Sequence, residues 1–239
     1  NAARYVAALA IRILTLRPDV VTASTFPPVA AAWVAGLTAR LVGARFIYHV
    51  QDIHPEASGL IGARLGRGPI AWLLRRLDNA TLMRADTVVT LSGDMAQTLR
   101  ARGVPIRKLL LIENPAMEDP DSPDEPELKD RKKPGKTRAI FAGNLGRFQN
   151  LPMLAEGVAR LFPLHPELEL CFLGDGAALP ALRAAWGSHP QVRFIPAVSI
   201  SKARALLAEA DIGLVALQPG MLRVASPSKV QTYAALGLP

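Results

Sequence analysis

The chain has 239 residues, of which 50% are hydrophobic, 20% charged and only 5% aromatic, and its formal net charge is +8. This length suits two domains or one large one, and the abundance of Ala, Val, Leu and Ile favours parallel strands buried under helices over stacked antiparallel sheets. The single cysteine, Cys171, excludes an internal disulfide and a cysteine-based zinc site.

Short apolar strands alternate with helices through the first half of the chain. Strands are expected at residues 19–23, 45–50, 87–91 and 108–112, and helices at residues 29–42, 69–84 and 92–102, the last capped by Ser92. Residues 20–39 carry no charge, but their prolines and threonines favour a strand, a turn and a helix over a membrane span. The β-α-β alternation predicts a parallel sheet wound by right-handed crossovers.

Residues 115–137 interrupt this alternation, because they are rich in Pro, Asp, Glu and Lys and nearly free of apolar residues. After them, strands are expected at residues 138–142, 168–173, 192–195 and 212–217, and helices at residues 151–162, 179–186, 202–210 and at the end of the chain. The sequence therefore predicts two Rossmann-like α/β domains, residues 1–114 and 138–239, joined by a linker or mobile loop at residues 115–137.

Positive charge concentrates in residues 1–114, which hold 13 Arg and 1 Lys against 5 Asp and 2 Glu. Its densest part is residues 64–84, where arginines interleave with isoleucine, tryptophan and leucine. Such a helix can lie on anionic lipid headgroups, and it can equally be a core-packed helix with a solvated arginine face. No nucleic-acid recognition motif accompanies the charge, so no nucleic-acid partner is expected. No secretory pattern is present, so we expect a cytoplasmic protein.

The last seventeen residues carry the start and stop signals of a helix that could bind an anion. Ser226 suits the N-cap, Pro227 the first helical position, and Gly237 a left-handed C-terminal stop. Free N–H groups at the start of such a helix favour a phosphate, and Ser228 and Lys229 stand in its first turn. The segment predicts a phosphorylated ligand, although a well-capped surface helix would use the same residues.

Three loops that follow strands in the second half are rich in glycine and polar residues, and ligands of such sheets bind beyond the carboxyl ends of the strands. They are residues 143–150, 174–176 and 218–220. Neither the GxGxxG nor the GxxxxGK[ST] motif is present, which weighs against a dinucleotide dehydrogenase and a P-loop NTPase.

The corresponding loop of the first half follows the strand at residues 45–50 and gathers titratable side chains. Asp52, His54 and Glu56 lie within five residues, with Gln51 beside them and His49 just upstream. These groups could orient or deprotonate a substrate hydroxyl, and an ordinary capped turn before a helix would use the same residues. A metal site on the two histidines is not expected, because the strand ends between them.

The order and spacing of these motifs resemble the retaining GT-B glycosyltransferases of family 4, particularly the branch acting in bacterial capsule, O-antigen and exopolysaccharide assembly. The resemblance runs through nearly the whole chain. It is carried by residues 17–21, 51–56, 84–86 and 113–115 in the first half, and by residues 141–146, 173–176, 210–215 and 227–229 in the second.

This resemblance implies transfer of a sugar from a nucleotide-sugar, UDP-linked, to a lipid-linked saccharide at the inner face of the cell membrane, with no metal or other cofactor. Asp52 and Glu56 would orient the acceptor or the sugar hydroxyls. The second domain would hold the donor: the diphosphate near Gly143, Asn144 and Arg147, with Gly146 in the same loop, and at Ser228 and Lys229; the nucleoside near Gly174, Asp175 and Gly176; and the base beside Ile195 and Pro196.

The chain also departs from the commoner pattern of this family. Asn144 and Gln149 stand where many relatives carry Arg and Lys, Val224 and Thr232 stand where a glutamate pair is usual, and Gln51 replaces a frequent histidine. A nucleotide-sugar epimerase of the same architecture and a noncatalytic nucleotide-sugar or membrane-binding subunit therefore stay as alternatives. The family pattern also places a strand before Asn1 and a crossover helix after Pro239, so a fragment without activity of its own is expected.

Overall fold

The computed structural model describes residues 2–60, 62–116 and 131–239. The chain divides into two compact units, Asn1–Glu113 with Pro219–Ser226, and Asn114–Gln218 with Pro227–Pro239. The predicted linker at residues 115–137 falls largely on residues 117–130, which lie outside the described part of the chain.

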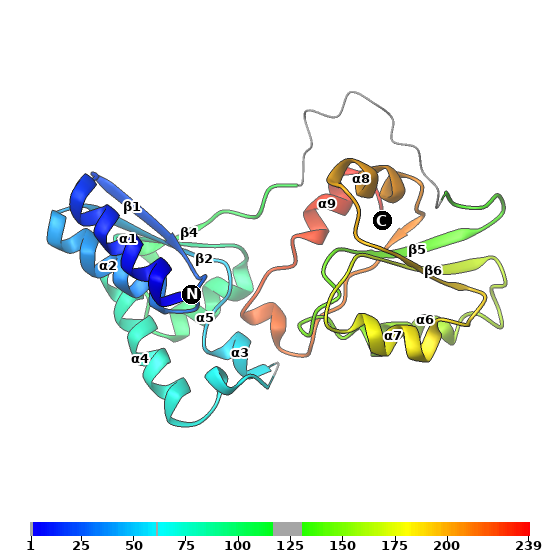
Figure 1. Ribbon diagram of the computed structural model, residues 1–239, viewed down its shortest axis with the longest axis horizontal. Helices are drawn as coiled ribbons and strands as arrows, with labels where there is room; N and C mark the ends of the chain where they lie inside the picture. Colours follow the sequence, from blue (N-terminus) through cyan, green and yellow to red (C-terminus); the bar gives the residue numbers. More distant parts are fainter. Residues whose placement is uncertain (1, 61, 117–130) are drawn as a thin grey trace. The chain divides into compact units, whose positions relative to one another are not determined.

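The first unit is built on a parallel four-stranded sheet in the order β1-β2-β3-β4 (Figure 1). Its strands are β1 (Val20–Ser24), β2 (Arg45–Val50), β3 (Thr87–Thr90) and β4 (Leu109–Leu111). The helices are α1 (Ala2–Leu16), α2 (Ala30–Val42), α3 (Glu56–Leu60), α4 (Gly68–Arg84) and α5 (Gly93–Ala101), with short 3-10 turns η1 (Arg64–Gly66), η2 (Ile106–Lys108) and η3 (Met221–Arg223).

Alternation along β2 shows how the sequence sets this unit's core. Phe46, Tyr48 and Val50 are buried, while the residues between them are more exposed. Helix α2 packs against β1 and β2, and α1 lies on α2. The predicted cap of α5 is confirmed, because the Ser92 hydroxyl accepts a hydrogen bond from the Met95 N–H at 3.2 Å.

The second unit has a parallel sheet in the order β7-β6-β5-β8. Its strands are β5 (Thr137–Ala142), β6 (Leu168–Leu173), β7 (Val192–Ile195) and β8 (Ile212–Gly213), and its helices are α6 (Leu151–Ala159), α7 (Leu179–Trp186), α8 (Ile200–Ala208) and α9 (Lys229–Ala235). Both faces of the sheet are covered, by α6 and α7 on one side and by α8 and α9 on the other (Figure 1).

Successive residues of the central strands supply the two cores of this unit. Phe141 and Phe172 pack with the residues of α6 and α7, while Ile140 and Cys171 pack with those of α8 and α9. Such strands, apolar on both faces, are typical of a parallel sheet between two helical layers. The predicted fold class, α/β with two Rossmann-like parallel sheets flanked by helices, is confirmed.

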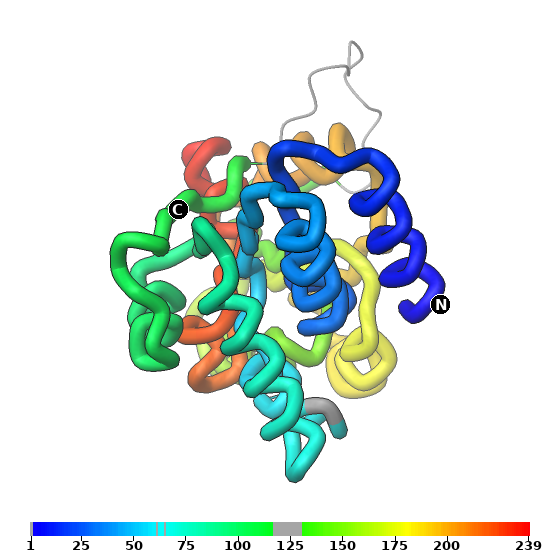
Figure 2. Tube along the Cα trace, turned by 90° about the vertical axis from the view of Figure 1, so that its left-hand side faces the viewer, coloured from blue at the N-terminus to red at the C-terminus, as the bar shows by residue number. Residues whose placement is uncertain are grey.

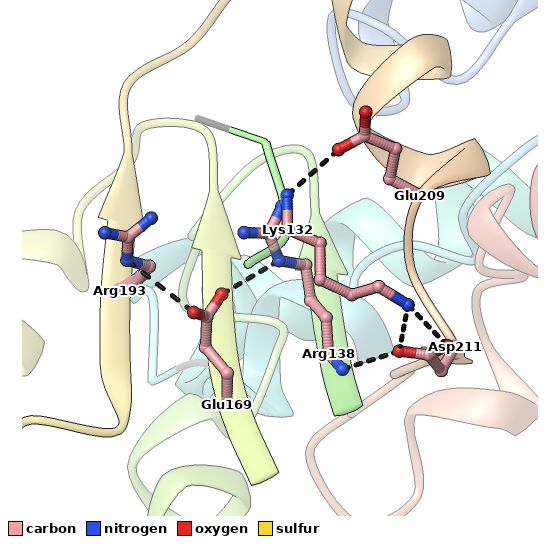
Figure 3. Close-up of polar contacts among 6 residues, drawn as sticks. All are labelled: Lys132, Arg138, Glu169, Arg193, Glu209 and Asp211. Atoms are coloured by element: carbon pink, nitrogen blue, oxygen red, sulfur yellow. Dashed lines mark hydrogen bonds and ion pairs between the residues drawn. The ribbon is translucent and has the colours of Figure 1, made fainter. Parts of the chain in front are cut away.

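At the end of this sheet where its strands begin, charged side chains form a network of ion pairs and hydrogen bonds (Figure 3). The Arg138 side chain on β5 is fully buried and pairs with Glu169 on β6 at 2.8 Å, and Arg193 on β7 lies 3.7 Å from the other Glu169 oxygen. The Lys132 ammonium nitrogen lies 2.7 Å from an Asp211 carboxylate oxygen. The backbone N–H of Lys132 donates a hydrogen bond to the Glu209 carboxylate at 3.0 Å. This network fixes the stretch of chain that leads into β5.

The structure differs from the sequence expectations at several elements. Helix α1 was not expected, and β8 is a two-residue strand rather than residues 212–217, because the Tyr233 hydroxyl takes the Leu214 carbonyl and the Gln218 N–H turns to Phe148. The last helix begins at Lys229 rather than after Ser226. Residues 219–226 pack on the first unit instead, where Ala225 forms a β-bridge with Asp52.

Candidate functional site

Three loops meet at the carboxyl edge of the second sheet. The Gly143 N–H donates to the Leu173 carbonyl at 2.8 Å, and the Gly174 N–H donates to the Ile195 carbonyl at 3.0 Å. These hydrogen bonds extend the pairing of β5 with β6 and of β6 with β7 past the strand ends. Gly143, Gly174 and Ile195 therefore lie side by side, and Pro196 follows them as an exposed residue.

Two of the glycines here are required by close backbone packing. Gly174 has φ +134°, and the Gly143 carbonyl fills the space where a Cβ on residue 174 would lie. Gly176 has φ +155°, and a Cβ there would be 2.5 Å from the Leu145 backbone. A side chain at either position would have to displace backbone atoms. The loops after β5 and β6 are therefore packed tightly against each other.

The polar side chains of the loops after β5 and β6 divide into two groups. The Gln149 side-chain oxygen accepts a hydrogen bond from the Gly146 N–H at 3.1 Å, so Gln149 stabilises the loop itself. Asn144, Arg147 and Asp175 are exposed. Asn144 and Arg147 are thus available for an anion, whereas Asp175 accepts from the Gly176 N–H at 2.7 Å.

The backbone N–H groups of these loops are largely engaged by the protein. Those of Gly143, Gly174, Gly146 and Gly176 all donate within the loops, and the Leu145 N–H donates to the Asp175 carbonyl at 2.8 Å. The glycines therefore serve close packing more than they offer free donors. An anion at this edge would be met mainly by side chains.

Lys229 is the cation that the structure places beside these loops. Its ammonium nitrogen lies 4.6 Å from the centre of the Phe141 ring, and its side-chain end lies 3.4 Å from the position of a Cβ on Gly143. The side chain is half-buried, and burial lowers the pKa of Lys229 below its ordinary value. Within the described residues, Lys229 makes no ion pair with a carboxylate.

Tyr233, one turn further along α9, fixes that lysine in place. Its hydroxyl accepts a hydrogen bond from the Ala142 N–H at 3.0 Å and lies 3.4 Å from the Leu214 carbonyl. Burial raises the pKa of Tyr233 to about 12, so the hydroxyl stays protonated. Because Lys229 and Tyr233 share one face of α9, the Tyr233 anchor aligns Lys229 with Gly143.

The start of α9 corrects part of the sequence prediction. Ser226 is not its N-cap, because α9 begins at Lys229, and Ser228, the residue before it, makes no side-chain cap. The seven-residue helix offers a weak dipole, so Lys229 rather than the helix end supplies positive charge. The predicted left-handed stop is confirmed, because Gly237 has φ +64°.

In the first unit, the loop after β2 is held from two sides. The Asp52 N–H donates to the Thr25 hydroxyl at 3.3 Å, and the Ile53 N–H donates to the Val224 carbonyl at 2.7 Å. Burial raises the pKa of the Asp52 carboxyl above its ordinary value. Asp52 makes no ion pair in the described part of the chain, so its carboxyl is available for a hydroxyl group.

Glu56 lies in a different environment from Asp52. Its carboxylate is 3.5 Å from the Arg75 Nε atom and 3.7 Å from an Arg102 Nη atom. Arg102 is buried and also pairs with Asp78 at 2.8 Å, and Asp78 accepts from the Tyr48 hydroxyl at 2.7 Å. Glu56 is therefore a member of a structural ion cluster beneath the loop, which the predicted role did not include.

The histidines and Gln51 complete the description of this loop. His54 is buried with Nδ1 3.0 Å from the Ser58 hydroxyl, and its carbonyl accepts from Arg102 at 3.3 Å. Burial lowers the pKa of His54. His49 is half-buried on β2, and Gln51 is exposed. No cluster of three or more His, Cys, Asp or Glu side chains suited to a metal ion occurs among residues 2–60, 62–116 and 131–239.

Sequence reasoning missed the residues that support each site. Arg102, Asp78 and Tyr48 come from three elements far apart in the chain, and no local motif marks them. Phe141 and Tyr233 read as ordinary core residues. The one usable signal was Asp78, the only acid among the residues of α4.

Comparison with known proteins gives a matching family for the first half of the chain. Residues 1–115 match the family described as Glycosyl transferase 4-like domain. Two curated proteins are each 28% identical: "Probable glycosyltransferase WbjE" of Pseudomonas aeruginosa, over 220 residues covering 89% of this chain and 54% of WbjE, and WcaI of Escherichia coli K12, named for colanic acid biosynthesis, over 84% of this chain and 51% of WcaI. The chain thus spans about half the length of these relatives.

The fold also matches solved structures. That of HepE from Anabaena in complex with UDP has a TM-score of 0.62 and 15% identity, covering 88% of this chain and 56% of HepE. Together these comparisons show similarity to glycosyltransferases in sequence and to HepE in fold. Among the described residues, no helix has the length and apolar content needed to cross a membrane.

Proposed function

We propose that this chain belongs to a retaining glycosyltransferase that moves a sugar from a UDP-sugar to a lipid-linked saccharide during cell-surface polysaccharide biosynthesis. The second unit binds the donor, and the first contributes groups that orient the acceptor. Sugar transfer in polysaccharide biosynthesis is supported by the similarity to WbjE and WcaI.

The observation that carries this proposal is the position of Lys229. A lysine half-buried against Phe141, with no carboxylate partner in the described residues, is a cation that lacks its counter-charge. Desolvation makes such a charge costly unless an anion binds it. The Lys229 side-chain end lies against Gly143, and Asn144 and Arg147 are exposed in the same loop.

A nucleoside diphosphate suits these groups. Lys229 and Arg147 would neutralise the diphosphate, while Asn144 and Ser228 would donate hydrogen bonds to it. Ile195, Pro196 and the segment Gly174–Gly176 would bound the base and the ribose. HepE, a neighbour in fold, was solved with UDP, which supports uracil as the base.

The chemistry required of these residues is stabilisation of a leaving group. As the bond between the anomeric carbon and the phosphate oxygen breaks, negative charge develops on the diphosphate. A cation fixed beside that oxygen stabilises the transition state more than the ground state. Lys229 is fixed in this way, because Tyr233 anchors α9 to the end of β5.

We assign the orientation of the acceptor to Asp52. Its carboxyl is free of ion pairs in the described residues and is held on a loop tied to Thr25 and Val224. It would accept a hydrogen bond from a sugar hydroxyl and orient it. Glu56 contributes through the Arg102 cluster that supports this loop, and Gln51 and His49 flank it.

The test is transfer of radiolabelled sugar from UDP-sugars to a bacterial lipid extract, by the protein that carries this chain at its natural length. Labelled lipid with the anomeric configuration of the donor supports the proposal. A change in the sugar of the UDP-sugar without any acceptor would indicate an epimerase instead. UDP binding without either reaction would indicate a noncatalytic subunit.

A further inference from the structure

Helix α6 presents an apolar outer face to solvent. It lies with α7 in the layer opposite α8 and α9, as both views of the second unit show (Figure 1 and Figure 2). The inner face of α6 packs in the core of this unit, but on the outer side Met153 is 58%, Leu161 45% and Leu164 76% exposed. These residues and Gly157 recur at intervals of three or four, so they line one side of the helix and of the turns that continue it.

Gly157 lies in the middle of this stripe, at a position where the chain itself does not require glycine. Its backbone is helical. Apart from its own helix backbone and its two neighbours in the chain, no atom of the described residues lies within 4 Å of the place that a Cβ would take. Glycine inside a helix lowers stability relative to alanine. It also leaves a gap in the helix surface, into which a second helix can pack closely.

The charges beside the stripe are of both signs and lie one turn apart. Glu156 on α6 and Arg160 directly after it are exposed, and neither makes an ion pair among the described residues. Because they are four residues apart, they lie on the same flank of the stripe. When two α6 helices pack antiparallel about a two-fold axis near residue 158, Glu156 of one copy faces Arg160 of the other, and this pair occurs twice. The charges of this face therefore complement those of a second copy.

We propose that α6 is the contact of a symmetric dimer, in which two copies of this chain pack their α6 helices antiparallel with Gly157 at the point of closest approach. Met153 of one copy then lies against Leu164 of the other at both ends of the contact. A second copy is favoured over an unrelated partner, because the apolar stripe and both charges match their own two-fold image. This inference goes beyond the proposed function and does not depend on it.

The size of the contact sets the strength of the dimer. Helix α6 has nine residues, so the interface that it can form is small. Interfaces that bury less than about 1,200 Å² in total are typically weak or transient, and we therefore expect a dissociation constant on the order of tens of micromolar. Dimers should accordingly exchange with single chains as the concentration changes.

The direct experiment is sedimentation equilibrium of the 239-residue chain at concentrations from about 2 to about 200 µM, a range that spans the expected dissociation constant. The mean mass should rise from that of one chain towards that of two. Gly157→Leu should keep the chain single throughout, because the new side chain fills the gap between the helices. Leucine suits an open helical position, so circular dichroism should show an intact fold. Ala208→Leu on α8, also exposed, is the matched control and should associate like the unaltered chain.

The charges give a second test, which separates contact between copies from effects within one helix. Glu156→Arg and Arg160→Glu should each weaken association about tenfold, since each places two pairs of like charges across the two-fold axis. An equimolar mixture of these two variants should associate again, because opposite charges then face each other at both places. Lys202→Glu on α8 changes the charge by the same amount as Arg160→Glu and should leave association unchanged.

Several outcomes would overturn the proposal. These are a folded chain that stays single at every concentration, association that persists in the Gly157→Leu variant, a mixture of the charge variants that does not associate, and equal losses in the α8 controls. UDP titration of the same samples keeps this proposal separate from the proposed function, because all of these variants should bind UDP as the unaltered chain does.

Discussion

The Lys229 ammonium stands 4.6 Å from the centre of the Phe141 ring, at the point where β5 ends and the glycine loop begins. Phe141 is fully buried, so its ring position is fixed by the core between the sheet, α6 and α7. The lysine charge is thereby held at one place with an aromatic face on one side. A mobile surface lysine would stabilise the negative charge of a transition state far less.

Replacing Lys229 by Ala should weaken UDP binding by about 1.5–3 kcal/mol, or roughly 10- to 150-fold, the range for a charge-assisted hydrogen bond. The measurement is calorimetric titration with UDP. Lys202→Ala is the control, because Lys202 is exposed on α8 of the same unit. Unchanged UDP affinity in the Lys229 variant would contradict its assignment to the diphosphate.

Gly174→Ala should destabilise the second unit by about 3 kcal/mol or more, because φ +134° is strained for alanine and the Gly143 carbonyl occupies the space of the new Cβ. Urea denaturation measures this. In contrast, Gly157→Ala in α6, where nothing lies within 4 Å of a Cβ, should stabilise the chain by about 0.5–1 kcal/mol. Similar effects of the two substitutions would show that the loop packing is not tight.

Asp52→Asn should lower the rate of sugar transfer while leaving UDP affinity nearly unchanged. The amide keeps the shape of the side chain and the backbone bridge to Ala225, but accepts hydrogen bonds less strongly from a hydroxyl. The pair of measurements is turnover by the protein at natural length and UDP titration. Loss of UDP binding with the fold intact would move Asp52 to the donor side.

Stability below neutral pH should depend on His54. Burial holds the pKa of His54 below its ordinary value of 6.5. As the pH falls through 6.5, the unfolded chain binds a proton at His54 before the folded chain does, so stability is lost until the pH passes the lower, folded pKa. His54→Gln should therefore lose less stability than the unaltered chain between about pH 7.5 and 5.5.

Denaturant titrations at the two pH values measure that difference. His165→Gln is the control, since His165 is exposed beside Glu167. An identical pH dependence in the His54 variant and the unaltered chain would mean that His54 takes up its proton as readily in the folded chain as in the unfolded one.

Glu169→Ala should destabilise the second unit by about 3–5 kcal/mol, because it leaves the fully buried Arg138 without this carboxylate. Thermal unfolding followed by circular dichroism is the measurement. Glu167→Ala, two residues earlier and exposed, should leave the transition unchanged. Equal transitions for the two variants would indicate that other contacts of Arg138 carry the stability.

Elements bounded by turn residues could be predicted to the residue. The strands β2, β6 and β7 and the helix α7 have the expected limits, because polar or turn-forming residues flank each apolar run. The start of α9 could not be predicted, since it depends on the pairing of Ala225 with Asp52, about 170 residues earlier in the chain.

The sites were predictable only in part. Glycines after strands marked the loops at Gly143 and Gly174, but the sequence did not reveal that their N–H groups are used within the protein. The tie between Arg102, Asp78 and Glu56 was also hidden, because a buried ion cluster depends on the three-dimensional arrangement of α3, α4 and α5. Ser226 was assigned a cap because local capping rules ignore such packing.

The central claim is that the second unit binds a uridine diphosphate group at Lys229. The most direct test is calorimetric titration of UDP into the 239-residue chain, with ADP and GDP titrated in parallel. We predict saturable binding of UDP, markedly tighter than of the other two nucleotides and lost in the Lys229→Ala variant. A folded chain that binds none of the three, or all three equally, would contradict the account.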